Sequence, residues 1–239
     1  MSRASNTARR AGRWIALGAG AAAATYGLMA ASAYVRYGRP ASPSPEEDDP
    51  LLDAFMPACE VAERHWIRVH APADATWRAA MEVRLQDSSV VRVIFRAREL
   101  VLGADPATAD PRGLLAQTLA LGYCVLHEEP GREVVVGAVT RPWEPNVTFR
   151  GVPATDFKVF NEPNYVKIAW TLRVEPLGPH EAICRTETRV ATTDATARAR
   201  FRWYWARFSP GIIVIRWMLL RQLKADAERA TIAPVPPRA

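Results

Sequence analysis

The segment 184–190 carries the residues in this sequence that are best suited to chemistry. Alternation along a strand puts Glu187 and Arg189 on one face and Thr186 and Thr188 on the other. If the charged face lines a cavity, Glu187 and Arg189 are the acid and the cation of a candidate enzyme. If the charged face points outward, the two threonine hydroxyls orient a ligand instead. The pattern favours the second arrangement, so we assign no catalytic residue.

Other familiar catalytic patterns are absent from the sequence. His65 and His70 lie five residues apart on a predicted strand, so they face opposite sides and cannot chelate one metal ion. The three cysteines form no Cys-x-x-Cys pair, and no nucleophile elbow or phosphate-binding glycine loop occurs. We therefore expect no metal and no cofactor, and the sequence does not favour a hydrolase, a kinase or a metalloenzyme.

The net charge of +6 does not point to a nucleic-acid partner. Nearly all the basic residues are arginines, and only Lys158, Lys167 and Lys224 are lysines. This composition accompanies a high alanine content and is weak evidence for a nucleic-acid partner. No run of basic residues interleaved with aromatics appears outside the last long helix. We expect no nucleic-acid partner.

A long helix predicted over 194–229 organises the rest of the chain. Thr193 and Asp194 occupy the N-cap position, and Pro210 should kink the helix or split it. Its apolar residues recur at steps of three and four, which places them on one face. These residues are Phe201, Trp205, Phe208, Ile212, Ile215, Leu219 and Leu223. On the other side, Trp203 and Trp217 call for a second apolar neighbour: short helices, a partner subunit or a bilayer surface.

The strand predicted over 165–175 supplies an apolar face for this helix to cover. Together the two elements predict a ligand cavity lined by aromatic and aliphatic side chains with a few hydroxyls. The predicted lining consists of Ile168, Trp170, Leu172, Thr186, Thr188, Phe201, Trp205 and Phe208. The same aromatic residues can instead fill a core, and the sequence leaves both interpretations open.

The N-terminal region predicts a membrane segment. A basic tail, 1–13, precedes the uncharged segment 14–35, which is long enough to cross a bilayer. The arginine excess before it predicts a single span in the cell membrane, with the N-terminus inside and the domain outside. The alternative is a signal peptide cleaved after Ala31-Ser32-Ala33, which would release a secreted domain.

The remaining boundaries follow from composition. Prolines and acidic residues over 36–57 predict an extended, solvated tether. A domain over 58–230 begins with a strand and short helices, and a flexible proline-rich tail covers 231–239. Further strands are predicted at 123–128, 133–140, 148–150, 156–160, 165–175 and 181–192, with turns between them. Short connections predict an antiparallel sheet curved around the last helix, which is an α+β domain.

Three segments resemble the START-like, or SRPBCC, superfamily, which includes polyketide cyclases and the birch pollen allergen. They are HWIRVHAPADATWRAAM (65–81), NYVKIAWTLRVEPLGPHEAICRTETRV (164–190) and the closing helix (193–229). The resemblance implies a helix-grip fold over the folded part of the chain, preceded here by a single transmembrane helix. It selects no activity, because one fold hosts many functions.

These observations predict a membrane-tethered domain that binds a small hydrophobic molecule or lipid in an internal cavity. One alternative is a cyclase-like or dehydratase-like enzyme, which requires Glu187 and Arg189 in the cavity. Another is a non-catalytic module whose Trp203 and Trp217 surface docks a membrane protein. The sequence sets no oligomeric state.

Overall fold

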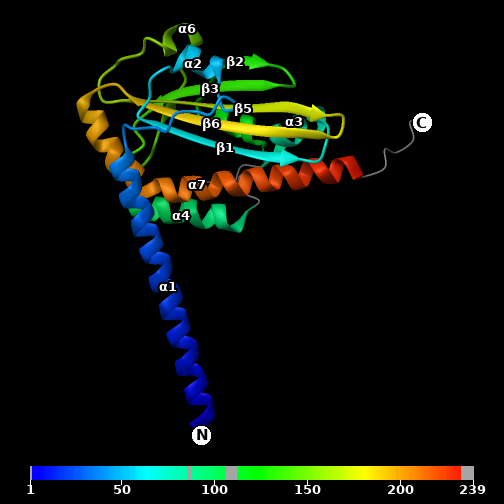
Figure 1. Ribbon diagram of the computed structural model, residues 1–239. Coiled ribbons are helices and arrows are strands. Elements are labelled where there is room, and N and C mark those ends of the chain that lie inside the picture. Colours follow the sequence, from blue (N-terminus) through cyan, green and yellow to red (C-terminus); the bar gives the residue numbers. More distant parts are fainter. Residues whose placement is uncertain (1, 85–87, 106–111, 233–239) are drawn as a thin grey trace.

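The computed structural model describes residues 2–84, 88–105 and 112–232, with side chains from Arg13 onward except Ile15. Over this range a curved antiparallel sheet of six strands lies against the long helix α7 (Ala195–Ile232). Helix α1 (Ser2–Arg36) projects away from the body on the α7 side (Figure 1). The predicted α+β, helix-grip arrangement is therefore confirmed.

The sheet has the order β1-β6-β5-β3-β2, with β4 paired to β3. Its strands are β1 (Val61–Val69), β2 (Cys124–Glu129), β3 (Glu133–Thr140), β4 (Phe149–Arg150), β5 (Val166–Gly178) and β6 (Glu181–Thr192). The long hairpin β5–β6 forms the centre, and β1 pairs with β6 in a register that sets Val61 opposite Val190. The first strand of the domain therefore becomes an edge strand beside α7.

The concave face of the sheet packs on α7. Alternate residues of the strands, among them Leu172, Val174 and Ala182, form one buried cluster with Leu220 and Leu223 of α7. Helix α3 (Ala73–Glu82) adds Ala75 and Ala80 to it. Burial of this apolar face, at about 25 cal/mol per Å², is the main force that holds the helix against the sheet.

Helix α7 begins as expected, because the Asp194 carboxylate accepts a hydrogen bond from the backbone N–H of Ala197 at 2.7 Å. Pro210 lies inside α7 and does not split it into two helices. The ribbon of α7 bends beside the upper end of α1 (Figure 1), as a proline without a backbone donor permits. The predicted tail over 231–239 lies outside the described residues from 233 onward.

Three further helices are α4 (Ser89–Leu102), α5 (Leu114–Ala120) and α6 (Ala154–Phe157). The strand predicted at 156–160 is wrong, because α6 occupies its beginning. Pro153 immediately precedes this short helix, and Phe157 is fully buried in a cluster with Leu126 and Val135. The segment is apolar because Phe157 is buried in this cluster, and not because alternate residues form one face of a strand.

The segment between α1 and β1 matches the solvated tether predicted for 36–57 only over 39–46, which is exposed and without regular structure, and its later part packs on the sheet. This later part lies along the convex face of the sheet and contains helix α2 (Pro50–Phe55), which is capped by the Asp49 carboxylate. Leu52 and Met56 are fully buried against Val135 and Val139. Its few apolar residues lie where they cover the strands, so the prolines and carboxylates did not prevent packing.

Helix α1 contains a segment, Ala16–Arg36, that is long and apolar enough to cross a membrane. It is continuous with residues 2–13, which are helical in the structure. Its last turns contact α7: Tyr34 lies against Trp203 with ring centroids 4.9 Å apart, and Arg202 donates to the Tyr34 carbonyl at 3.0 Å. Part of the second apolar neighbour that α7 required is thus α1 itself.

Candidate functional site

The charged face of β6 points away from α7. Glu187 and Arg189 are both buried on the convex face, where the Arg189 Nε donates to Glu187 at 2.7 Å. Arg64 of β1 pairs with the same carboxylate at 2.9 Å, and Asp53 of α2 pairs with Arg189. Helix α2 thereby closes over an ion-pair cluster, and the cyclase-like alternative loses the two residues that it required beneath α7.

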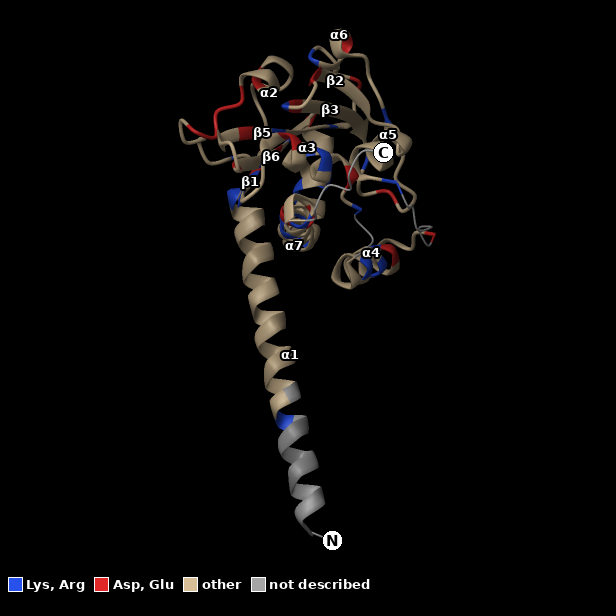
Figure 2. Ribbon diagram, turned by 90° about the vertical axis from the view of Figure 1, so that its right-hand side faces the viewer, with Lys and Arg blue, Asp and Glu red and all other residues tan. Residues whose placement is uncertain are grey.

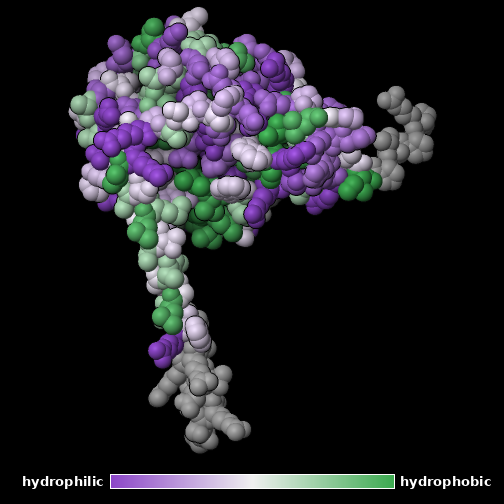
Figure 3. All heavy atoms as spheres, in the orientation of Figure 1, coloured by the Kyte–Doolittle hydropathy of each residue, from purple (hydrophilic) through white to green (hydrophobic). Residues whose placement is uncertain are grey.

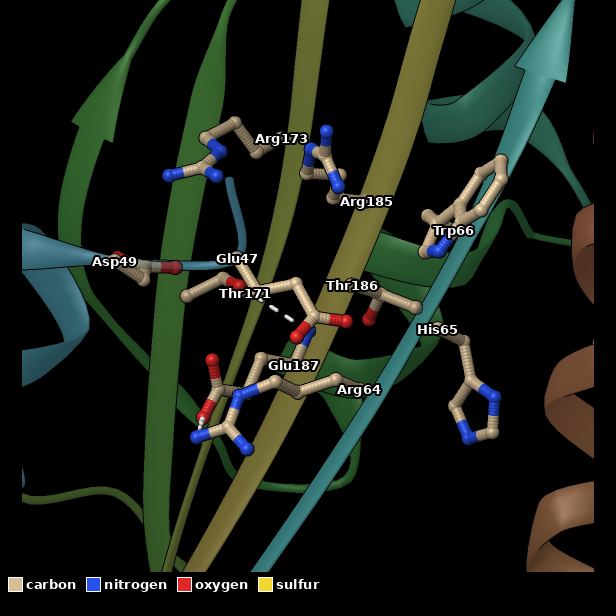
Figure 4. Close-up of a pocket in the computed structure, with 10 residues that line it drawn as sticks. All are labelled: Glu47, Asp49, Arg64, His65, Trp66, Thr171, Arg173, Arg185, Thr186 and Glu187. Atoms are coloured by element: carbon tan, nitrogen blue, oxygen red, sulfur yellow. Dashed lines mark hydrogen bonds and ion pairs between the residues drawn. The ribbon is translucent and has the colours of Figure 1, made fainter. Parts of the chain in front are cut away.

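The space within this cluster is small. Figure 4 shows Arg64, Glu187, Arg173 and Arg185 gathered on one side of the strands, while the His65 side chain points toward α7. The enclosed volume is about 20 Å³, which suffices for about one water molecule. The cluster therefore fastens the N-terminal segment to the sheet rather than holding an organic ligand.

The concave face holds a polar group of a different kind. Arg216 of α7 donates from its guanidinium to the hydroxyl of Thr186 at 3.2 Å and to the hydroxyl of Thr188. Its Nε has no hydrogen-bond partner among the described residues. Burial lowers the pKa of Arg216 to about 10, so the side chain stays charged at neutral pH. The predicted threonines thus meet a cation that the sequence did not point to.

Two residues of β1 complete this polar group. His65 lies edge-on to the Trp217 ring at 5.9 Å, and its Nε2 is 3.8 Å from the carboxylate of Glu63. Burial, followed by the nearby charge of Arg216, lowers the pKa of His65 to about 4. Burial also raises the pKa of Glu63, against the opposing effect of Arg216. At neutral pH the cluster holds a charged arginine, a neutral histidine and a carboxyl group.

The predicted apolar lining is divided between packed and partly open positions. Leu172, Phe201 and Trp205 are buried, and Thr186 and Thr188 are nearly so. Ile168, Trp170 and Phe208 are only partly buried, although the first two lie on the middle strand of the sheet. Phe201 stacks on Trp205 at 6.0 Å, which shows that these two rings pack on each other. The core interpretation therefore agrees with the burial of Leu172, Phe201 and Trp205.

A groove at the edge of the domain lies near these residues. Its volume is about 630 Å³, within the range of small-molecule sites. Four elements line it: the end of α1, the chain after it, β1 and the middle of α7. Of the predicted residues, only Trp205 reaches it; its other apolar walls include Leu28, Met29 and Ile213.

Some charged residues that line this groove have hydrogen-bond or ion-pair partners, and others have no ion-pair partner among the described residues. Glu60 accepts hydrogen bonds from Thr192, and Arg64 is paired with Glu187. Arg36 and Arg39 form no ion pair with any residue that the structure describes. Glu63 lines the groove and also neighbours Arg216, so the groove adjoins the polar cluster under the sheet. The lining thus combines apolar side chains with two cations that have no ion-pair partner among the described residues.

Sequence reasoning missed Arg216 and the contribution of α1. Arg216 follows Ile212 and Ile215 on the apolar face of α7. In a sequence, a single arginine at such a position is usually interpreted as a side chain that extends to solvent. The register that brings Thr186 and Thr188 to it depends on how α7 crosses the sheet. The groove depends on the packing of α1 against α7, which no local pattern encodes. Among the described residues, no cluster of metal-binding side chains occurs.

No protein-family model matches the sequence, and no curated protein is significantly similar to it. Solved structures are similar over most of the chain. Protein CV1439 from Chromobacterium violaceum is 14% identical, with 70% of this chain and 96% of that chain covered and a TM-score of 0.32. An aromatase/cyclase from Streptomyces sp. R1128 is 14% identical, with 72% and 96% covered and a TM-score of 0.27.

Norcoclaurine synthase from Thalictrum flavum, solved with dopamine and hydroxybenzaldehyde, is 12% identical. It covers 69% of this chain and is itself covered over 84%, with a TM-score of 0.32. Identities this low say nothing about substrate or activity. The curved antiparallel sheet and the long closing helix of the chain itself form a helix-grip arrangement, and the comparison supports no more than this fold.

Proposed function

We propose that this protein is a membrane-anchored binding domain that holds an amphipathic, lipid-like molecule in the groove beside α1. The observation that carries the proposal is the groove of about 630 Å³, whose walls come jointly from the candidate span and from the domain. A ligand that leaves a bilayer along α1 reaches Leu28 and Met29 first and then meets β1 and α7. The groove therefore offers apolar surface continuous with the span.

The chemistry of the groove specifies the kind of ligand. Leu28, Met29 and Ile213 suit an acyl chain or an apolar ring system, since burial of each methylene contributes about 0.8 kcal/mol. Arg36 and Arg39, which have no ion partner among the described residues, suit an anionic head group. We infer an amphiphile with one negatively charged end, such as a fatty acid or a phospholipid.

The anchor follows from α1 and from the charges before it. Four arginines precede the uncharged segment, which favours an N-terminus inside and a domain outside. Cleavage after Ala33 would remove most of the α1 wall of the groove and the hydrogen bond from Tyr26 to α7. These contacts support the uncleaved span over the signal-peptide alternative.

Photocrosslinking of the full chain tests this function. The chain is reconstituted in vesicles that contain a diazirine-bearing fatty acid, irradiated and digested, and the adducts are mapped by mass spectrometry. Adducts on α1 arise in any bilayer, whereas adducts on Val61, Ala62 or Glu63 require a ligand inside the groove. We expect adducts on these β1 residues in the wild type.

A matched pair of variants controls the crosslinking. Ile213→Trp places a large ring in the groove, whereas Val214→Trp alters a neighbouring residue that does not line it. The first should lower labelling of β1 about tenfold, which corresponds to ~1.4 kcal/mol, and the second should leave it unchanged. Absence of β1 adducts in the wild type, or equal labelling in both variants, would contradict the proposal.

A further inference from the structure

Helix α4 exposes an apolar stripe that no described part of the chain covers. Val90, Val93, Leu100 and Val101 are 42%, 66%, 84% and 62% exposed. With Ala97 they recur at steps of three and four, so they share one face of the helix. Arg92 and Arg96 are exposed beside this stripe. An apolar stripe with an arginine flank is the pattern of a helix that lies in a membrane interface.

Helix α4 is held firmly on α7 through its opposite side. Val91 is fully buried, and Arg98 donates to the hydroxyl of Tyr204 at 3.4 Å. Gly211 of α7 allows the close approach, because a Cβ at that position would come within 2.9 Å of the Ile94 side chain. The stripe therefore has a fixed direction relative to α7 and is not part of the inner packing.

The candidate span fixes where this surface lies. The Tyr26 hydroxyl donates to the Arg207 carbonyl of α7, and Tyr26 is within Ala16–Arg36. At 1.5 Å per residue, Tyr26 is about 15 Å along the helix from Arg36. Tyr26 is the middle residue of Ala16–Arg36, and Tyr34, which packs on Trp203, lies near its outer end. If Ala16–Arg36 spans a bilayer, α7 therefore contacts it between the bilayer centre and the outer boundary, within the outer leaflet rather than above the surface.

The figures place α4 on the same side of the molecule. Helix α4 lies beyond α7 from the sheet, on the side from which α1 projects (Figures 1 and 2). Hydrophobic side chains gather on the underside of the body beside the upper end of α1 (Figure 3). On α7, Val214 and Trp217 are 39% and 50% exposed and extend the apolar surface.

We propose that the exposed stripe of α4, together with α7, lies in the outer leaflet of the bilayer that α1 crosses. The occupant is a lipid surface, because the contact between α1 and α7 brings this surface to membrane depth. Arg96, which is exposed beside the stripe on α4, extends its guanidinium group toward the phosphates. The inference rests on the proposed membrane anchor, and it makes the domain a partly immersed body rather than a tethered one.

The test is depth-dependent quenching on the full chain. A fluorescent label is placed at Val93→Cys or Leu100→Cys, and in a control chain at Val159→Cys. Val159 is 72% exposed and follows α6, at the opposite end of the body from α1 (Figure 1). Cys59 and Cys124 are replaced by serine, and Cys184 is retained because its thiol is buried and burial raises its pKa to about 12.

The labelled chains are incorporated into phosphatidylcholine vesicles with and without spin-labelled phosphatidylcholine. We expect labels at Val93 and Leu100 to be quenched at least about threefold more than the label at Val159, because only the α4 stripe contacts lipid. Equal quenching at the two ends of the body overturns the inference. So does a Val93 label that is shielded from iodide but unaffected by lipid, which would indicate a protein partner.

Flotation of the same vesicles separates the two proposals. A chain that floats with the vesicles while its Val93 label stays unquenched retains the anchor and rejects the immersed surface. A chain that does not float rejects the anchor and the immersed surface together.

Discussion

Arg216 places a positive charge between the closing helix and the sheet, next to two neutral hydroxyls rather than a carboxylate. Arg216 forms no ion pair within 4.0 Å with any described residue. Among the acidic side chains, Glu63 has the largest effect on the pKa of Arg216. A charge taken out of water without a close partner costs several kcal/mol unless hydrogen bonds replace the lost solvation. Thr186 and Thr188 supply those hydrogen bonds.

Removal of one hydroxyl should therefore be costly. Thr188→Val keeps the shape of the side chain and leaves an Arg216 donor unsatisfied, so we expect a loss of about 1–3 kcal/mol of unfolding free energy. The measurement is denaturant unfolding of the full chain in detergent. In an Arg216→Met background the same substitution should cost much less, because the donor is gone. Equal costs in both backgrounds would show that the hydroxyl does not serve the arginine.

Glu133 gives the molecule a pH dependence near neutrality. It is 3% exposed beside the equally buried Asp49, and burial, followed by repulsion from Asp49, raises the pKa of Glu133 to about 7. The folded state then binds a proton that the unfolded state releases near pH 4.5. Stability from this group is present below pH 4.5 and is lost as the pH rises toward 7.

Substitution by glutamine should reveal this dependence. Glu133→Gln removes the cost of ionising the buried carboxyl, so its Tm should exceed that of the wild type at pH 8. At pH 4 the two proteins should unfold at the same temperature, because the wild-type carboxyl is then protonated. Thermal scans at the two pH values give the comparison, and a Tm difference that does not change with pH would contradict the assignment.

Among the elements, α2 departs most from expectation. Leu52 is fully buried under the sheet, whereas its neighbour Leu51 is only partly buried. Leu52→Ala should cost about 2–5 kcal/mol, and Leu51→Ala distinctly less. A solvated tether would make both substitutions neutral. Unfolding of the two variants under identical conditions distinguishes the packed segment from the tether.

The elements that sequence predicted best are those with a long periodic pattern. The stripe of α7 and the alternation of β5 and β6 predicted the fold class, the central antiparallel hairpin and, as the favoured alternative, the outward direction of Glu187 and Arg189. Short segments failed, because α2 and α6 each depend on one or two anchors, such as Leu52 and Phe157. No period exists in so few residues.

The candidate site was predicted less well, for a physical reason. Trp205 was found from its place on the α7 stripe, but the groove around it is built by residues 28–64 together with the distant helix α7. The partner of Thr186 and Thr188 is an arginine on another element, and only the crossing of α7 over the sheet brings them together. Tertiary contacts of this kind leave no local signal.

At the scale of the whole molecule, α1 is both a candidate span and a wall of the binding groove. Its contacts with α7 through Tyr26 and Tyr34 hold the groove beside the candidate span, and the chain after it fastens to the convex face of the sheet. In the function that we propose, anchor, groove and domain form one unit, and a ligand would pass between membrane and protein without crossing water.

Native mass spectrometry of the full chain released from lipid nanodiscs tests whether the groove holds an amphiphile. We predict that the wild type and Val214→Trp each retain one amphiphile with an anionic head group, and that Ile213→Trp emerges without it because the new ring occupies the groove. A wild-type chain that carries no such molecule, or an Ile213→Trp chain that carries as much as the wild type, would contradict a binding site in this groove.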